Sequence, residues 1–135
     1  MTMEEFDKFN VIILGIIFNP REKKILIGRR KNSLEGSWEF PSGKAVHGED
    51  VDKTLKRHAE AKTGYVVKNL GTFFSENSSE KEDLILIYFL TEVFEGEEKP
   101  GDDFVELKWI HPKELEDHFT TSAHKKLKEY LMNLV

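Results

Sequence analysis

The residues of this chain that could do chemistry gather in one stretch, GKAVHGEDVDKTLKRHAEAKTG, at positions 43–64. It places an acid, Glu49, before a segment without Gly or Pro that contains Arg57, His58 and Lys62. A carboxylate can bind a divalent metal ion or pair with a guanidinium, an imidazole can also bind a metal, and an ammonium can bind phosphate. The stretch therefore indicates a site for a metal ion, for phosphate or for both.

The segment 50–63 is expected to position these groups as an amphipathic helix. Val51, Leu55 and Ala59 recur every four residues, acids stand at the start, and Gly64 occupies the C-terminal cap position. With about 3.6 residues per turn, positions 58, 61 and 62 share one face. That face would carry an imidazole, a methyl group and an ammonium.

The remaining apolar runs predict strands. The run 11–18 is rich in β-branched residues and ends at the turn NPREKK, so it should form a hairpin with 24–30. In the second strand of this hairpin, Ile25 and Ile27 are expected to share one face. A short strand at 38–43 is expected to be broken by Pro41 and Gly43, and a polar loop is predicted at 76–83. Further strands are predicted at 65–74, 84–94 and 104–110.

The C-terminus is predicted to be a helix, with Thr121 or Ser122 as its N-cap. Its apolar stripe consists of Ala123, Leu127, Tyr130, Leu131 and Leu134. The order of strands, helix, strands and helix indicates an α/β or α+β sandwich, a mixed sheet packed between helices. The 135 residues are expected to form a single domain.

Composition excludes several classes of function. A formal net charge of −5 argues against nonspecific binding of a nucleic-acid polymer, which depends on excess Lys and Arg. The absence of cysteine excludes disulfides and thiolate metal sites. The longest apolar run, VIILGIIF, is far shorter than the roughly 20 residues of a membrane span, so no membrane partner is expected and the protein is predicted to be cytoplasmic.

The stretch resembles the box of the Nudix (MutT-like) hydrolases. Residues in register with that box and its lead-in are Trp38, Glu39, Phe40, Pro41, Gly43, Lys44, Glu49, Arg57, Ala59 and Gly64. The resemblance extends to ILIGRR before the box and ELKWIHPKEL after it, and it implies an α/β/α sandwich. Where the family has three helical glutamates, this chain has His58, Ala61 and Lys62; Ser42 and Val46 also depart from the pattern.

The resemblance implies a reaction in which a metal-activated water attacks a nucleoside diphosphate linked to another group. The cofactor would be Mg²⁺ or Mn²⁺, with Glu49 and Arg57 in the catalytic box and Glu106 as a candidate general base. Alternatively, Glu49 serves as an acid at a helix start or as the partner of Arg57. His58 could also join Glu49 and His47 in a site for zinc, manganese or nickel.

Lys62 supports a different function, because a fixed ammonium can neutralise a bound diphosphate without any cofactor. Arg29, Arg30 and Lys44 lie on segments that border the substrate cleft in the family, so they are candidate phosphate contacts. The favoured hypothesis is binding of a nucleoside diphosphate derivative with weak or lost hydrolysis, and the alternative is an active metal-dependent hydrolase. A third is an interaction protein, dimeric through a sheet edge or the C-terminal helix.

Overall fold

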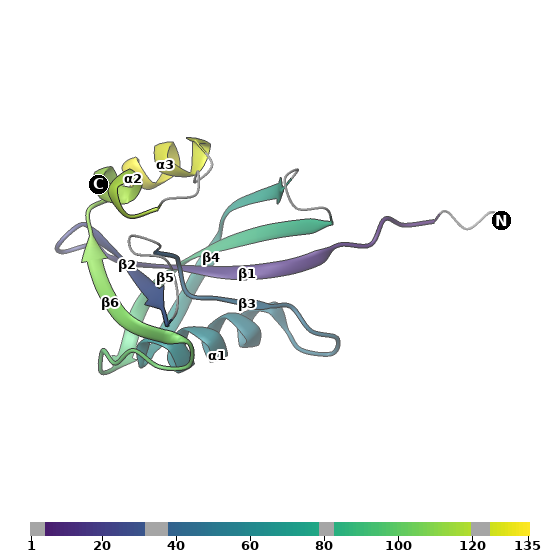
Figure 1. Cartoon of the computed structure of the whole chain (residues 1–135), viewed down its shortest axis with the longest axis horizontal. Helices are drawn as coiled ribbons and strands as arrows, with labels where there is room; N and C mark the ends of the chain where they lie inside the picture. Colours follow the sequence, from purple (N-terminus) through teal and green to yellow (C-terminus); the bar gives the residue numbers. More distant parts are fainter. Residues whose placement is uncertain (1–4, 32–37, 79–82, 120–124) are drawn as a thin grey trace.

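A mixed six-stranded sheet carries helices on both faces in the computed structural model, which describes residues 5–31, 38–78, 83–119 and 125–135 (Figure 1). The strand order is β4-β5-β1-β2-β6, with β3 beside β1. The strands are β1 (Asn10–Asn19), β2 (Lys24–Arg30), β3 (Ser42–Lys44), β4 (Tyr65–Ser78), β5 (Leu84–Gly96) and β6 (Phe104–Ile110). The helices are α1 (Val51–Thr63), the 3₁₀ turn η1 (Pro112–Glu114), α2 (Leu115–His118) and α3 (Lys125–Met132).

Helix α1 lies against one face of the sheet, and α2 and α3 lie on the other side (Figure 1). This arrangement confirms the predicted α/β/α sandwich with a mixed sheet. Within the described residues, no helix is long and apolar enough to cross a membrane.

Strands β1 and β2 separate soon after the turn that joins them. They pair only at Phe18↔Ile25 and Asn19↔Lys24. Beyond that point β1 runs parallel to β5, and β2 pairs with β6. The segment before β3 fills the space between them, because Gly28 and Glu39 exchange backbone hydrogen bonds and the Gly15 amide donates to the Pro41 carbonyl.

Alternation along β2 divides its side chains between two cores. Ile25 and Ile27 share one face, as predicted, and join the core under α3, while Leu26 joins the core under α1. The core under α3 includes Ile16, Phe40, Tyr88, Ile110, Leu115, Leu127 and Leu131. The same alternation sends Arg29 and Arg30, at the end of β2, to opposite faces of the sheet.

Helix α1 begins and ends where the sequence pattern predicts. Gly64 follows Thr63 with a φ of 80°, and its amide donates to the Glu60 carbonyl. Leu55 and Ala59 are buried as predicted, but the expectation for Val51 was wrong. Val51 is 40% exposed, because the buried stripe begins one turn later and includes Thr54 and Lys62.

Two strand predictions need correction. Strand β4 continues to Ser78, because its last residues still pair with β5 through Ser78↔Leu84, so the predicted polar loop is partly strand. Gly43 lies inside β3 rather than interrupting a strand. A Cβ at Gly43 would overlap the His58 ring, so only glycine lets the ring pack there.

The C-terminal helix confirms part of its predicted stripe. Leu127 and Leu131 are buried, and the Tyr130 ring packs edge-on against Phe73 and Phe74. The predicted N-cap residues 121 and 122, and position 123, lie outside the described residues. The sequence prediction missed η1 and α2, although His111, Pro112 and Glu114 form a capping box that marks a helix start.

Two glycines allow the crowding at the end of α1 to be tested against a matched control. Gly48 and Gly64 have almost the same φ, 79° and 80°, but a Cβ at Gly64 would overlap the Glu97 carbonyl, whereas one at Gly48 meets nothing within 4 Å. Gly48→Ala should lower the free energy of unfolding by about 1–2 kcal/mol, the cost of a left-handed alanine. Gly64→Ala should cost at least ~1 kcal/mol more. Equal losses in urea unfolding would contradict the close approach.

Candidate functional site

The carboxylate of Glu49 accepts hydrogen bonds from two side chains of α1. Its Oε1 accepts from Thr54 Oγ1 at 2.6 Å and from Arg57 Nη2 at 2.8 Å, and its Oε2 accepts from Arg57 Nε at 3.2 Å. The bidentate geometry is the strong form of a carboxylate–guanidinium pair. The hydrogen bonds from Arg57 and then Thr54 lower the pKa of Glu49 to about 2. Glu49 is therefore charged at neutral pH, with both oxygens already bonded to protein groups.

His58 lies one residue further along α1, with its ring against Gly43. Burial lowers the pKa of His58, and the positive charges of Arg57 and Lys62 lower it further. The imidazole is therefore neutral at pH 7. His47, the other imidazole weighed as a metal ligand, instead lines an open hollow at the start of β1.

Lys62 is buried on the side of α1 that faces β6. Its side chain is 5% exposed, and its Nζ lies 3.2 Å from Asp103 Oδ1 and 5.2 Å from the centre of the Phe104 ring. The Phe104 ring covers Gly28, where a Cβ would overlap it. The ammonium is thus held between a carboxylate and an aromatic face, rather than extended into open solvent.

Asp103 connects Lys62 to a second cation. Arg30 Nε lies 3.4 Å from Asp103 Oδ2 and 2.7 Å from Glu39 Oε1. The four side chains form a row of alternating charge, Lys62–Asp103–Arg30–Glu39, which we name the charge row. It joins α1, the segment before β6, β2 and the segment before β3.

The segment before β6 also caps α1, which fixes Asp103 relative to Lys62. The Lys99 amide donates to the Thr63 carbonyl at 2.9 Å, and the Gly101 amide donates to the Lys62 carbonyl at 3.1 Å. These bonds satisfy carbonyls that a helix end leaves without an intrahelical partner. The C-terminal turn of the helix and the acid beside it therefore form one unit.

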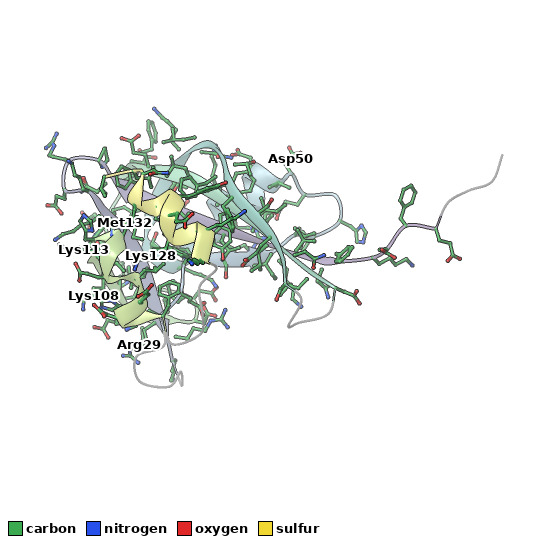
Figure 2. The ribbon with its side chains drawn as sticks, turned by 90° about the horizontal axis from the view of Figure 1, so that it is seen from above. Arg29, Asp50, Lys108, Lys113, Lys128 and Met132 are labelled. Atoms are coloured by element: carbon green, nitrogen blue, oxygen red, sulfur yellow. The ribbon has the colours of Figure 1, made fainter. Side chains whose placement is uncertain are left out.

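The other predicted site residues lie elsewhere. Arg29 pairs with Glu106 at 3.1 Å; the two are opposed on β2 and β6, on the face away from α1. Lys108 is paired with Ile27 on the same two strands and lies on that face as well; Figure 2 labels Arg29 and Lys108. Lys44 lines the same hollow as His47. Of the four predicted phosphate-binding cations, the structure brings together Arg30 and Lys62.

Sequence reasoning did not single out Asp103 or Thr54. The paired acids of PGDDF, directly before a strand, are the signal that could have drawn attention to Asp103. Thr54 stands five residues after Glu49, on the first turn of a helix, where a hydroxyl can reach a preceding acid. Ala61, on the predicted metal face, is exposed.

The chain belongs to the Nudix family, since the NUDIX domain model matches residues 8–131. It is 32% identical over 129 residues to an ADP-ribose pyrophosphatase of Methanocaldococcus jannaschii, a match that covers 90% of this chain and 72% of the relative. It is 27% identical over 103 residues to an 8-oxo-dGTP diphosphatase of Buchnera aphidicola, covering 76% of this chain and 78% of that protein.

Solved structures show the same fold. A MutT structure from work on Aliivibrio salmonicida and Vibrio cholerae superimposes with a TM-score of 0.78 at 24% identity, covering 95% of this chain and all of the other. A Nudix hydrolase from Nitrosomonas europaea gives the same TM-score at 18% identity, covering 96% of this chain and 73% of the other.

Nudix hydrolases generally use divalent metals such as Mg²⁺ or Mn²⁺, and the residues present here do not fit such an ion. Positions 58, 61 and 62 supply no carboxylate, and the ammonium of Lys62 repels a cation. Glu49 is already bonded to Arg57 and Thr54. In the part of the chain that the structure describes, no group of three or more His, Asp or Glu residues is placed to hold a metal ion.

The low pKa of Glu49 makes stability depend on pH in acid. The folded pKa, about 2, is below the ordinary value of 4.5, so the carboxylate contributes stability that is fully present above about pH 4.5. That contribution is lost as the pH falls through 2. The Glu49 carboxyl should titrate near pH 2 by NMR, and Arg57→Ala should move its pKa toward 4.5. An unchanged pKa in Arg57→Ala would show that Arg57 does not hold the carboxylate.

Proposed function

We propose that this protein binds a nucleoside diphosphate derivative through Lys62 and Arg30, and that it hydrolyses its ligand slowly or not at all. The observation that carries the proposal is the charge row, which places two cations on either side of one carboxylate. The charge row begins at Lys62, on the face of α1 where the family has its glutamates. Two cations separated by an anion are the arrangement that a phosphate group can enter.

Asp103 occupies the position that we assign to a ligand phosphate. Its Oδ1 is buried but receives no hydrogen bond from the described residues, so its interaction with Lys62 is a contact between charges. A phosphate has more acceptor oxygens than a carboxylate and could satisfy both cations better. Arg30 and Asp103 are 47% and 40% exposed, so the exchange can take place from solvent.

Weak hydrolysis follows from the groups that remain. A carboxylate with a pKa of about 2 is a poor general base at neutral pH, and Glu49 is held by Arg57 and Thr54. Glu106, the other candidate base, pairs with Arg29 on the opposite face of the sheet. Neither carboxylate lies in the charge row.

The second candidate is an active hydrolase of the same class of compound. It is supported by the similarity to the M. jannaschii and Buchnera proteins, which are named as a pyrophosphatase and a diphosphatase, and by the retained Glu49 and Arg57. ADP-ribose is therefore the first compound to test for both binding and turnover.

Calorimetric titration with ADP-ribose tests the proposal directly. Binding should persist in EDTA with an affinity within about twofold of that in Mg²⁺, because protein cations neutralise the diphosphate. Lys62→Met, which keeps the length of the side chain but removes its charge, should weaken binding by about tenfold, equivalent to ~1.4 kcal/mol. Binding that needs Mg²⁺, together with release of AMP, would favour the active hydrolase. No binding in either buffer would refute the proposal for this ligand.

Removing the charge of Asp103 should have the opposite effect on binding from removing the charge of Lys62. Asp103→Asn removes the charge that competes with phosphate, so ADP-ribose should bind about tenfold more tightly, again ~1.4 kcal/mol. Asp102→Asn is the matched control, because Asp102 is exposed, lies next in sequence and forms no ion pair with Lys62. Equal gains in both variants would indicate a general charge effect. Urea unfolding of both variants checks that the fold is kept.

A further inference from the structure

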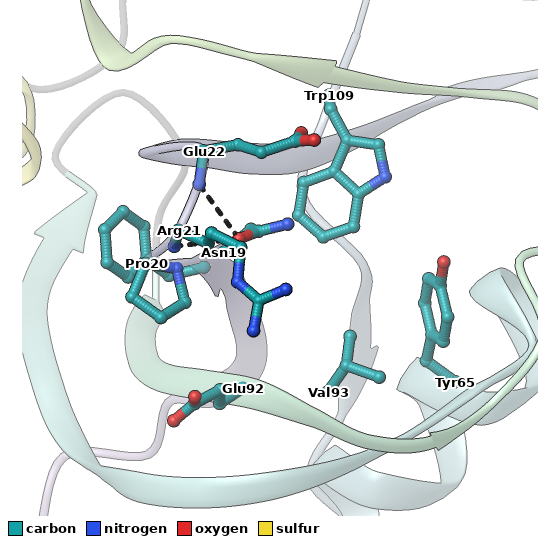
Figure 3. Close-up of a pocket in the computed structure, with 9 residues that line it drawn as sticks. Asn19, Pro20, Arg21, Glu22, Tyr65, Glu92, Val93 and Trp109 are labelled. Carbon is teal, nitrogen blue, oxygen red and sulfur yellow. Dashed lines mark hydrogen bonds between the residues drawn. The ribbon is translucent and has the colours of Figure 1, made fainter.

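A hollow of about 430 Å³ opens beside the turn between β1 and β2 (Figure 3). The turn and the end of β1 supply one wall, and strands β4, β5 and β6 supply the rest. The lining residues are Phe18, Asn19, Pro20, Arg21, Glu22, Tyr65, Glu92, Val93 and Trp109. Trp109 is paired with Leu26, four residues before Arg30 on β2, so about 13 Å of strand separates this hollow from the charge row.

One wall of the hollow is aromatic and is held in place by a single carboxylate. Glu98 Oε1 accepts from Trp109 Nε1 at 2.6 Å and from Tyr65 Oη at 3.3 Å. The two ring centres are 6.4 Å apart, and the rings are inclined at 57°. Because both polar edges are bonded to Glu98, the ring orientations are fixed, and a planar ligand can stack on Trp109.

The opposite wall offers donors and acceptors that form no side-chain hydrogen bond or ion pair within the part of the chain that the structure describes. Asn19 Oδ1 accepts from the Arg21 and Glu22 amides at 3.0 and 3.1 Å, so its NH₂ group is directed away from the turn. The Arg21 guanidinium points into the hollow, between Trp109 and Glu92 in the view of Figure 3. It forms no ion pair with any described carboxylate, although Glu22 and Glu92 line the same hollow.

We propose that this hollow binds a guanine base, stacked on Trp109. Guanine O6 and N7 are the acceptors that a guanidinium recognises, which suits Arg21. Its N1–H and amino group are adjacent donors for a carboxylate, which Glu22 or Glu92 can supply. Adenine is disfavoured, because an asparagine reads it with both amide atoms and the oxygen of Asn19 is already bonded to the turn.

The site does not depend on the proposed function, because it uses no residue of the charge row. Guanosine, which has no phosphate, is therefore the suitable probe. The chain contains two tryptophans, so Trp38→Phe leaves Trp109 as the only reporter. Guanosine should quench its fluorescence with saturation, and adenosine should bind at least about tenfold more weakly.

Variants at the opposite wall decide the outcome. Arg21→Ala should weaken guanosine binding at least about tenfold, as should the double change Glu22→Gln and Glu92→Gln, whereas Lys44→Ala, at the separate hollow beside the start of β1, should leave it unchanged. If Trp38→Phe does not fold, the indole N–H signal of Trp109 in the unmodified chain serves instead. Absence of quenching or of a shift at millimolar guanosine, equal binding of adenosine, or full binding by Arg21→Ala would each overturn the proposal.

Discussion

The burial of one ammonium group determines how the end of α1 is built. An unpaired charge cannot be taken out of water without a large cost, so Lys62 requires a carboxylate at the same depth. Asp103 meets this requirement, and the backbone around it caps the last carbonyls of the helix. Arg30 then balances the second oxygen of Asp103, and Glu39 balances Arg30. The positions of three segments far apart in sequence thus follow from the need to neutralise one side chain.

The separation of β1 from β2 makes that arrangement possible. After two paired positions the strands take different partners, and the segment carrying Glu39 bonds to β2 in the gap. Glu39 can therefore reach Arg30, and Gly43 can meet the face of α1 that carries His58. Glycine at 43 and at 28 gives the neighbouring rings of His58 and Phe104 their space. Close packing near the charge row thus depends on these two glycines as much as on the larger side chains around them.

The sequence predicted most of the fold, because strand and helix periodicity are local properties. It identified all six strand regions and the ends of α1, and it paired Ile25 with Ile27 on one face. That same alternation also places Arg29 and Arg30 on opposite faces of the sheet. The burial of Lys62 could not be predicted from the sequence, since periodicity shows which face of a helix a residue is on but not what packs against that face. Asp103 is 41 positions from Lys62 in sequence, and a single charge pair at that separation leaves no periodic signal.

The substitutions in the box change the kind of electrostatics available to a ligand. Three glutamates carry three negative charges, and they attract divalent ions that both neutralise a diphosphate and activate water. His58, Ala61 and Lys62 carry a single positive charge, because burial and the neighbouring cations keep His58 neutral. An ammonium can neutralise a phosphate oxygen, but it has no open coordination position in which to lower the pKa of a water molecule. The Nudix fold is retained, together with the ion pair between Glu49 and Arg57 that connects the start of α1 to its middle. The charges that these box residues present to a ligand are therefore those of one carboxylate–guanidinium pair and one ammonium.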